Sequence, residues 1–136
     1  MQIELFDPLK DDYESAPVGD LIPFNLSKEL SHTWFFDIDG TIAVRHHPYR
    51  IKDELLPGVK ELWAQIPAND VIVITSARPV HYQRKTMKWI DSMGLRYDHV
   101  LFGLAHGERI VVNDNKPGGL ETAIAWNVKR NKGFVK

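Results

Sequence analysis

The stretch TWFFDIDGT (residues 33–41) decides the fold that we expect of this chain. Its first five residues, Thr33–Asp37, form a short aromatic run that ends in an acid, a pattern typical of a buried strand. Asp37 and Asp39 are two positions apart and share one face of an extended chain, and Gly40 allows a sharp turn directly after them. The stretch therefore predicts a pair of carboxylates at the carboxyl end of a strand.

Strand and helix patterns alternate after this stretch. A helix is expected over residues 57–66, because apolar residues recur at helical spacing between Pro57 and Pro67. Residues 71–76 (VIVITS) are typical of a strand covered on both faces, and residues 79–93 predict a helix that ends at Gly94. Short strands are expected over 97–102 and 109–113, a helical turn over 117–122, and either a last strand or the end of a longer helix over 123–128. The alternation implies an α/β fold, a Rossmann-like three-layer sandwich with a mostly parallel five-stranded sheet and helices on both faces.

Length and composition are those of an ordinary single domain. The chain has 136 residues, a net charge of −1 and no cysteine, which excludes disulfides, thiolate metal sites and a cysteine nucleophile. Residues 1–30 hold seven acids and two bases, whereas residues 31–136 hold 15 bases and 11 acids. We therefore expect an irregular acidic N-terminal extension (1–30) and one catalytic domain (31–136). No apolar run approaches the roughly 18 residues of a membrane span and no secretory leader is visible, so we expect a cytoplasmic protein without a membrane partner.

Polar side chains follow the predicted strands at their carboxyl ends, where parallel sheets bind ligands. Carboxylates placed together repel one another unless a divalent cation lies between them, and an oxygen-rich site without His or Cys ligands favours Mg²⁺ over Zn²⁺. One carboxylate can then attack phosphorus to form an aspartyl-phosphate while another handles the proton. In strand order the residues are Asp37 and Asp39, then Thr75, Ser76 and Arg78, then Asn113, Asp114 and Lys116.

The string WFFDIDGT (residues 34–41) resembles motif I, hhhDxDGT, of the HAD (haloacid dehalogenase-like) superfamily of phosphatases, and the resemblance covers about residues 33–128. It implies that Asp37 is the nucleophile and a Mg²⁺ ligand. It also implies that Asp39 is the general acid and base, with a backbone carbonyl that binds the metal. Ser76 resembles the motif II hydroxyl that holds the phosphoryl group, and Arg78 completes the [S/T]-x-R ending as a second phosphate-binding residue. Thr75 is either a further phosphate contact or only a β-branched strand residue.

Two later motifs depart from the family pattern. Asn113-Asp114 stands where an acidic pair is usual, so Asp114 is the expected metal ligand. Asn113 either coordinates the metal through its amide oxygen, orients a water or caps the following turn. The motif III cation is missing from its usual place. Lys116 is the best substitute, with Arg109 and His106 as further candidates, and a solvated loop lysine is the plain alternative for Lys116.

Only about 16 residues separate Thr41 from Pro57, so the resemblance implies an enzyme without a cap domain and with an open site. The loop at its mouth carries Arg45, His46 and Tyr49, which either contact the substrate or form a solvated polar surface. This loop resembles that of the phosphatase domain in polynucleotide kinase/phosphatase enzymes. The later Asn-Asp-x-Lys-Pro segment instead resembles small HAD proteins linked to surface-carbohydrate synthesis.

The expected function is Mg²⁺-dependent hydrolysis of a phosphomonoester, with a sugar phosphate or a phosphorylated nucleic acid end as the substrate. The alternative is a catalytically weak module on the same fold that binds phosphate without turnover. An open site also leaves room for a partner subunit, so an oligomer is compatible with the sequence.

Overall fold

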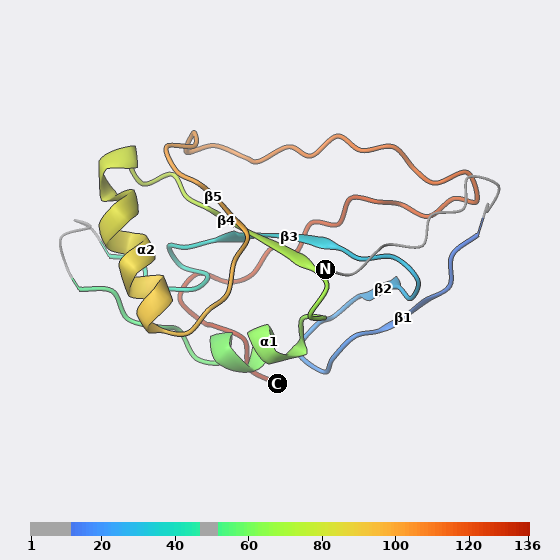
Figure 1. The fold of residues 1–136 in the computed structure, drawn as a ribbon, viewed down its shortest axis with the longest axis horizontal. Coiled ribbons are helices and arrows are strands. Elements are labelled where there is room, and N and C mark those ends of the chain that lie inside the picture. Colours follow the sequence, from blue (N-terminus) through green and yellow to red (C-terminus); the bar gives the residue numbers. More distant parts are fainter. Residues whose placement is uncertain (1–11, 47–51) are drawn as a thin grey trace.

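The computed structural model describes residues 12–46 and 52–136 of the chain (Figure 1). Its strands are β1 (Ser15–Pro17), β2 (Asn25–Ser27), β3 (Thr33–Asp37), β4 (Val71–Thr75) and β5 (His99–Leu101). Its helices are α1 (Val59–Gln65), a 3₁₀ turn η1 (Val80–Tyr82) and α2 (Gln83–Ser92). None of the helices in these ranges has the length and apolar character needed to cross a membrane.

The strands form two separate sheets. β1 and β2 pair antiparallel, and β3, β4 and β5 form a parallel sheet in that order. The expected Rossmann-like sandwich with a mostly parallel five-stranded sheet is therefore wrong. The chain is a small α/β protein in which five strands are divided between an antiparallel pair and a three-stranded parallel sheet.

The difference arises in the part of the chain that follows β5. Residues 109–113, expected as a strand, and residues 123–128, expected as a last strand or the end of a longer helix, pair with no neighbour and have no regular secondary structure. Ile110 and Val112 are 85% and 88% exposed. Figure 1 shows the chain after β5 crossing from the side of α2 to the end of the molecule where β1 begins, and then turning back. A β-branched run becomes a strand only where it pairs with a neighbour, and residues 109–113 make no such pairing with the edge strands β3 and β5. The helical turn expected over 117–122 is instead a reversal closed by a hydrogen bond from Lys116 N to Leu120 O at 2.9 Å.

One face of the sheet carries most of the core. Trp34, Phe36, Ile72 and Ile74 point to that face and are buried in one core with residues of both α1 and α2. On the opposite face Phe35 is 61% exposed, whereas its neighbour Val73 is 6% exposed. The expectation of helices on both faces is thus not met in the described residues, because both helices contribute to the same core.

The two ends of the described chain meet over the buried face. The β1–β2 pair lies within the region expected to be irregular. Directly before β2, the Phe24 ring lies 6.0 Å from Trp34 of β3 and 5.5 Å from Trp126. Trp126 contacts Phe134 at 5.2 Å. The aromatic side chains therefore join the N-terminal strands, the sheet and the C-terminal segment into one body.

The C-terminal segment also passes close to the start of α1. Phe134 N donates a hydrogen bond to Pro57 O at 2.8 Å. Gly58, just before α1, has a φ of 78°, and a Cβ there would overlap the carbonyl oxygen of Phe134. Only glycine accepts both the left-handed backbone and the contact.

The helices agree well with the sequence. α1 begins after Pro57 and ends before Pro67, as the prolines predicted. The segment expected as one helix over 79–93 is η1 followed by α2, and Gly94, with a φ of 74°, ends it as predicted.

Candidate functional site

A tight turn positions the two acids after β3. The carbonyl of Ile38 accepts hydrogen bonds from the backbone N–H groups of Thr41, Ile42 and Ala43 at 3.1, 2.9 and 3.0 Å. Ile38 and Ile42 are completely buried, and Gly40 has a φ of 86°. The buried side chains hold the turn against the core. The backbone positions of Asp37 and Asp39, on either side of Ile38, are therefore fixed.

Asp37 lies beside a cation. Arg109 Nη1 donates to Asp37 Oδ1 at 3.1 Å and to Thr75 Oγ1 at 3.2 Å, and the Thr75 hydroxyl donates to Phe36 O at 3.0 Å. The Asp37 side chain is 37% exposed and so stays accessible to a ligand. Burial raises the pKa of Asp37, Arg109 offsets part of this, and the charge of Asp39 raises the pKa further.

Arg109 therefore places a positive charge directly beside Asp37. It was one of the further candidates for the missing motif III cation, after Lys116. A guanidinium beside a carboxylate reduces the repulsion between that carboxylate and an incoming anion, and it offers N–H donors to the anion.

Asp39 belongs to a second, more buried network around Arg78, whose side chain is 3% exposed. Arg78 Nε and Nη2 donate to the two carboxylate oxygens of Asp39 at 3.0 and 2.8 Å. Nη2 and Nη1 donate to the two oxygens of Asp53 at 2.8 and 3.2 Å, and Nη1 also donates to Thr86 Oγ1 at 2.9 Å. Burial lowers the pKa of Arg78, but the bonds to Asp39 and Asp53 outweigh it and raise the pKa overall.

This network gives Arg78 a role other than the expected one. A guanidinium has five N–H groups, and the five bonds to Asp39, Asp53 and Thr86 use all of them. Arg78 therefore has no donor left for a phosphate in this arrangement. It holds Asp39 in place instead.

The hydroxyl of Ser76 lies next to this network. Ser76 is 1% exposed, and its Oγ accepts a hydrogen bond from Arg78 N at 2.9 Å. Thr75 is 4% exposed and already donates to Phe36 O. Of these two predicted phosphate contacts, Ser76 keeps the freer hydroxyl proton.

The predicted residues after position 112 are not brought to the acid pair. Asn113 Nδ2 donates to Thr122 O at 3.2 Å, and Asp114 O accepts from the Thr122 hydroxyl. The Lys116 amine lies 6.0 Å from the ring centre of Tyr13, near β1. These residues follow the segment that runs away from the carboxyl end of β3 (Figure 1).

The four-residue Mg²⁺ set of Asp37, Asp39, Asn113 and Asp114 is consequently not assembled. Across residues 12–46 and 52–136, no group of three or more acid or histidine side chains could hold a metal ion. The Asp39 carboxylate already bonds Arg78.

The loop after the turn returns close to its start. Val44 N donates to Glu54 O, and Leu56 N donates to Ile42 O, both at 2.9 Å. Arg45, a predicted substrate contact, is exposed, and its backbone N–H donates to Asn131 Oδ1 at 2.7 Å. His46 Nε2 is buried without a hydrogen-bond partner among the described residues. Tyr49 lies outside the described residues.

Sequence reasoning missed Asp53, Thr86 and Asn131. Asn131 N donates to Gly40 O at 2.9 Å, which fastens the C-terminal segment to the turn after Asp39, and its φ is 62°. Asp53 is one acid in a polar loop and Thr86 one hydroxyl in a helix, so no local pattern marks either. Asn-Lys-Gly at 131–133 is a turn signal that could have indicated the reversal at Asn131.

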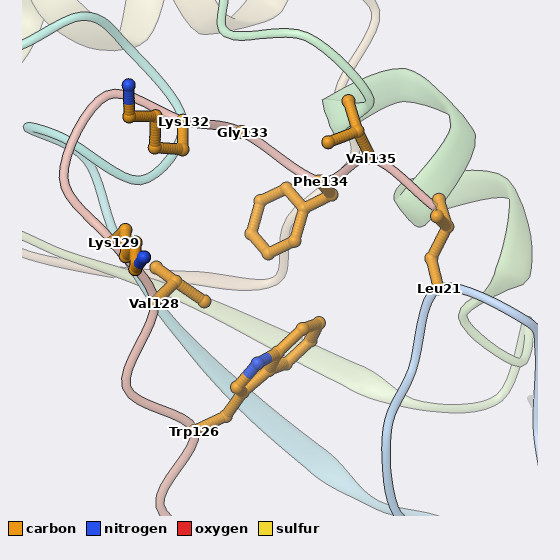
Figure 2. A pocket seen from close by; sticks show the side chains of 8 residues that line it. All are labelled: Leu21, Trp126, Val128, Lys129, Lys132, Gly133, Phe134 and Val135. Carbon is orange, nitrogen blue, oxygen red and sulfur yellow. The ribbon is translucent and has the colours of Figure 1, made fainter.

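A pocket of about 250 Å³ lies away from the acid pair. Figure 2 shows the rings of Trp126 and Phe134 in it, with Lys129 and Lys132 at one side. Neither Asp37 nor Asp39 lines it, so the pocket is separate from the acid pair.

No family model, curated protein or solved structure matches this chain.

Proposed function

We propose that the protein is a HAD-type phosphomonoester hydrolase with Asp37 as the nucleophile and Asp39 as the general acid and base. The observation that carries the proposal is the accessible Asp37 carboxylate, 3.1 Å from Arg109 Nη1, two residues from an acid that Arg78 holds in place. An exposed carboxylate, a cation at its side and a second carboxyl group held two residues away suit phosphoryl transfer to a carboxylate.

The proposed chemistry has two steps. An Asp37 oxygen attacks phosphorus, the bond from phosphorus to the leaving oxygen breaks, and Asp39 gives that oxygen a proton. Water then attacks phosphorus and loses a proton to Asp39, the acyl-phosphate bond breaks, and inorganic phosphate leaves. Arg109 donates to the phosphoryl oxygens in both steps.

Mg²⁺, predicted from the sequence, does not fit the described residues. Of the predicted carboxylate ligands, only Asp37 is accessible beside the turn after β3, because Asp39 is bonded by Arg78 and Asp114 lies on the segment that leaves the site. The two steps therefore use side chains alone, and the experiment compares activity with and without Mg²⁺.

The test is a panel of phosphomonoesters assayed for phosphate release with Mg²⁺ and with chelator. The panel includes sugar phosphates and 3′-phosphorylated oligonucleotides, the two substrate classes that the sequence left open. Asp37→Asn should lower turnover by at least about a thousandfold, as expected for loss of a nucleophile. Asp91→Asn, which neutralises an acid on α2 that accepts a hydrogen bond from Tyr97, should leave turnover unchanged.

The second candidate is a phosphate-binding module without turnover. It is favoured by the unassembled metal set and by the double hydrogen bond that the Asp39 carboxylate accepts from Arg78. Inorganic phosphate that binds through Arg109, in a protein that leaves the whole panel intact, would select this candidate over the hydrolase.

A further inference from the structure

Asp53 is the unexpected member of the network around Arg78. Both of its carboxylate oxygens accept from the guanidinium, at 2.8 and 3.2 Å, and its side chain is 13% exposed. The same guanidinium makes the equivalent double contact with Asp39, whose side chain is also 13% exposed. One buried cation is thus shared by two carboxylates of similar exposure.

The sharing fixes the rotation of the guanidinium. Nε and Nη2 form the edge that faces Asp39, and the edge formed by Nη2 and Nη1 faces Asp53. Thr86 Oγ1 takes the remaining N–H at 2.9 Å. A planar fork bonded on two edges cannot turn without breaking several charge-assisted hydrogen bonds at once. Asp39 is therefore held by Arg78, and Arg78 is in turn held by Asp53.

We propose that Asp53 is a positioning residue that, through Arg78, keeps the Asp39 carboxyl group aimed at the leaving oxygen of the substrate. This inference rests on the proposed hydrolase function and names a residue in it. Without Asp53, two N–H groups of a buried guanidinium lose their acceptors, and Arg78 can turn away from the geometry that holds Asp39. Misplacing a proton donor by a fraction of an ångström weakens proton transfer much more than it weakens substrate binding.

The experiment compares two esters of similar shape, phenyl phosphate and p-nitrophenyl phosphate. Phenolate is the more basic leaving group, so its departure depends more on a proton from Asp39. The measured quantity is the ratio of kcat/KM for p-nitrophenyl phosphate to that for phenyl phosphate. This ratio does not depend on the folded fraction of a preparation, so a purely structural defect does not move it.

Asp53→Asn should raise this ratio by about tenfold or more, in the direction of Asp39→Asn, which removes the acid itself. Glu54→Gln is the matched control, because Glu54 is the exposed acid next in sequence on the same loop, and it should leave the ratio unchanged. Thr86→Val keeps the side-chain shape, removes one acceptor of Arg78, and should raise the ratio by about fivefold. If Asp53→Asn fails to fold, the ratio measured for Thr86→Val alone tests the role of the network around Arg78.

Three results would overturn the inference. Equal losses on both esters in Asp53→Asn and Thr86→Val would show that the network is only structural. An unchanged ratio in Asp39→Asn would show that Asp39 is not the donor. Wild-type protein that hydrolyses neither ester would remove the proposed function, and with it the role of Asp53, whereas the first two results leave the hydrolase itself in place.

Discussion

Arg109 and Lys116 are two cations of the same segment with different surroundings. Arg109 contacts Asp37 and Thr75, whereas Lys116 lies beside the ring of Tyr13. Their sequence positions alone favoured Lys116, because it follows the Asn-Asp pair directly. The path of the chain after β5 reverses that preference. It places Arg109 at the carboxyl end of β3 and Lys116 near Tyr13, away from Asp37.

Arg109→Ala should lower kcat/KM for phosphomonoesters by about a hundredfold, since it removes the only cation observed to contact Asp37 in the described residues and leaves the carboxylate to repel the substrate. Lys116→Ala is the matched control and should stay within twofold of wild type, a margin of roughly 0.4 kcal/mol. Steady-state kinetics on both variants checks the assignment. A large loss in Lys116→Ala with an active Arg109→Ala would reverse it.

Residues of the candidate site could be predicted where a local sequence pattern contains them. Asp37 and Asp39 follow from the spacing in TWFFDIDGT, and the structure places Asp37 as the last residue of β3. Asp53 could not be found in this way, because its partner Arg78 is 25 positions away in sequence. The role of Arg78 was inferred from a three-residue motif, which does not show how many of its donors the protein itself uses.

At the scale of elements, local periodicity was enough for β3, β4, α1 and α2, whose apolar spacing and flanking prolines or glycines are contained in their own sequences. Residues 109–113 have an equally strong propensity for a strand, but they form no strand. Strand formation depends on a partner supplied by the rest of the chain, and the sequence of the run does not contain that information. The β1–β2 pair was missed because three-residue strands among prolines give almost no alternation.

The start of α1 offers a test of how the C-terminal segment is held. Gly58→Ala should destabilise the protein by about 3 kcal/mol or more, because the new methyl group adds an overlap with Phe134 to the backbone strain. Gly94→Ala is the control: its φ of 74° is similar, but nothing lies within 4 Å of a Cβ there. It should cost only the strain of about 1 kcal/mol. Urea denaturation measures both, and equal losses would contradict the contact.

A buried cluster joins the starts of β3 and β4 to β2. His32 Nδ1 lies 2.9 Å from Asp70 Oδ2, and the other ring nitrogen lies 2.9 Å from Ser27 O. Trp34 Nε1 donates to Asp70 Oδ2 at 2.9 Å. Burial raises the pKa of Asp70, but the hydrogen bonds from His32 and Trp34 outweigh it, so the pKa lies below its ordinary value of 3.8.

A lowered pKa makes this cluster a pH-dependent source of stability. The ionised Asp70 stabilises the fold above pH 3.8, and that contribution is lost as the pH falls through the lower pKa of the folded state. The free energy of unfolding of the wild type should therefore fall more steeply below pH 3.8 than that of Asp70→Asn. Denaturant titrations at a series of pH values measure the two slopes, and parallel curves would argue against the link.

For the molecule as a whole, the contrast between the buried core and the exposed segment after β5 sets where substitutions matter. Val59 at the start of α1 is completely buried, whereas Val112 is 88% exposed. Val59→Ala should cost about 1.5 kcal/mol or more, and Val112→Ala should stay within about 0.5 kcal/mol of wild type. Both are read from the midpoint and slope of urea unfolding. A loss at Val112 as large as that at Val59 would mean that residues 109–113 are buried after all.

The aromatic contacts over the covered face give the protein its own spectroscopic probe. Trp126 touches both Phe24 and Phe134, and Trp34 is stacked on Phe36 at 5.9 Å. Indole emission shifts to longer wavelength when water reaches the ring. Detachment of the C-terminal segment would therefore expose Trp126 before Trp34. The wavelength of the tryptophan emission maximum would report that step without any attached dye.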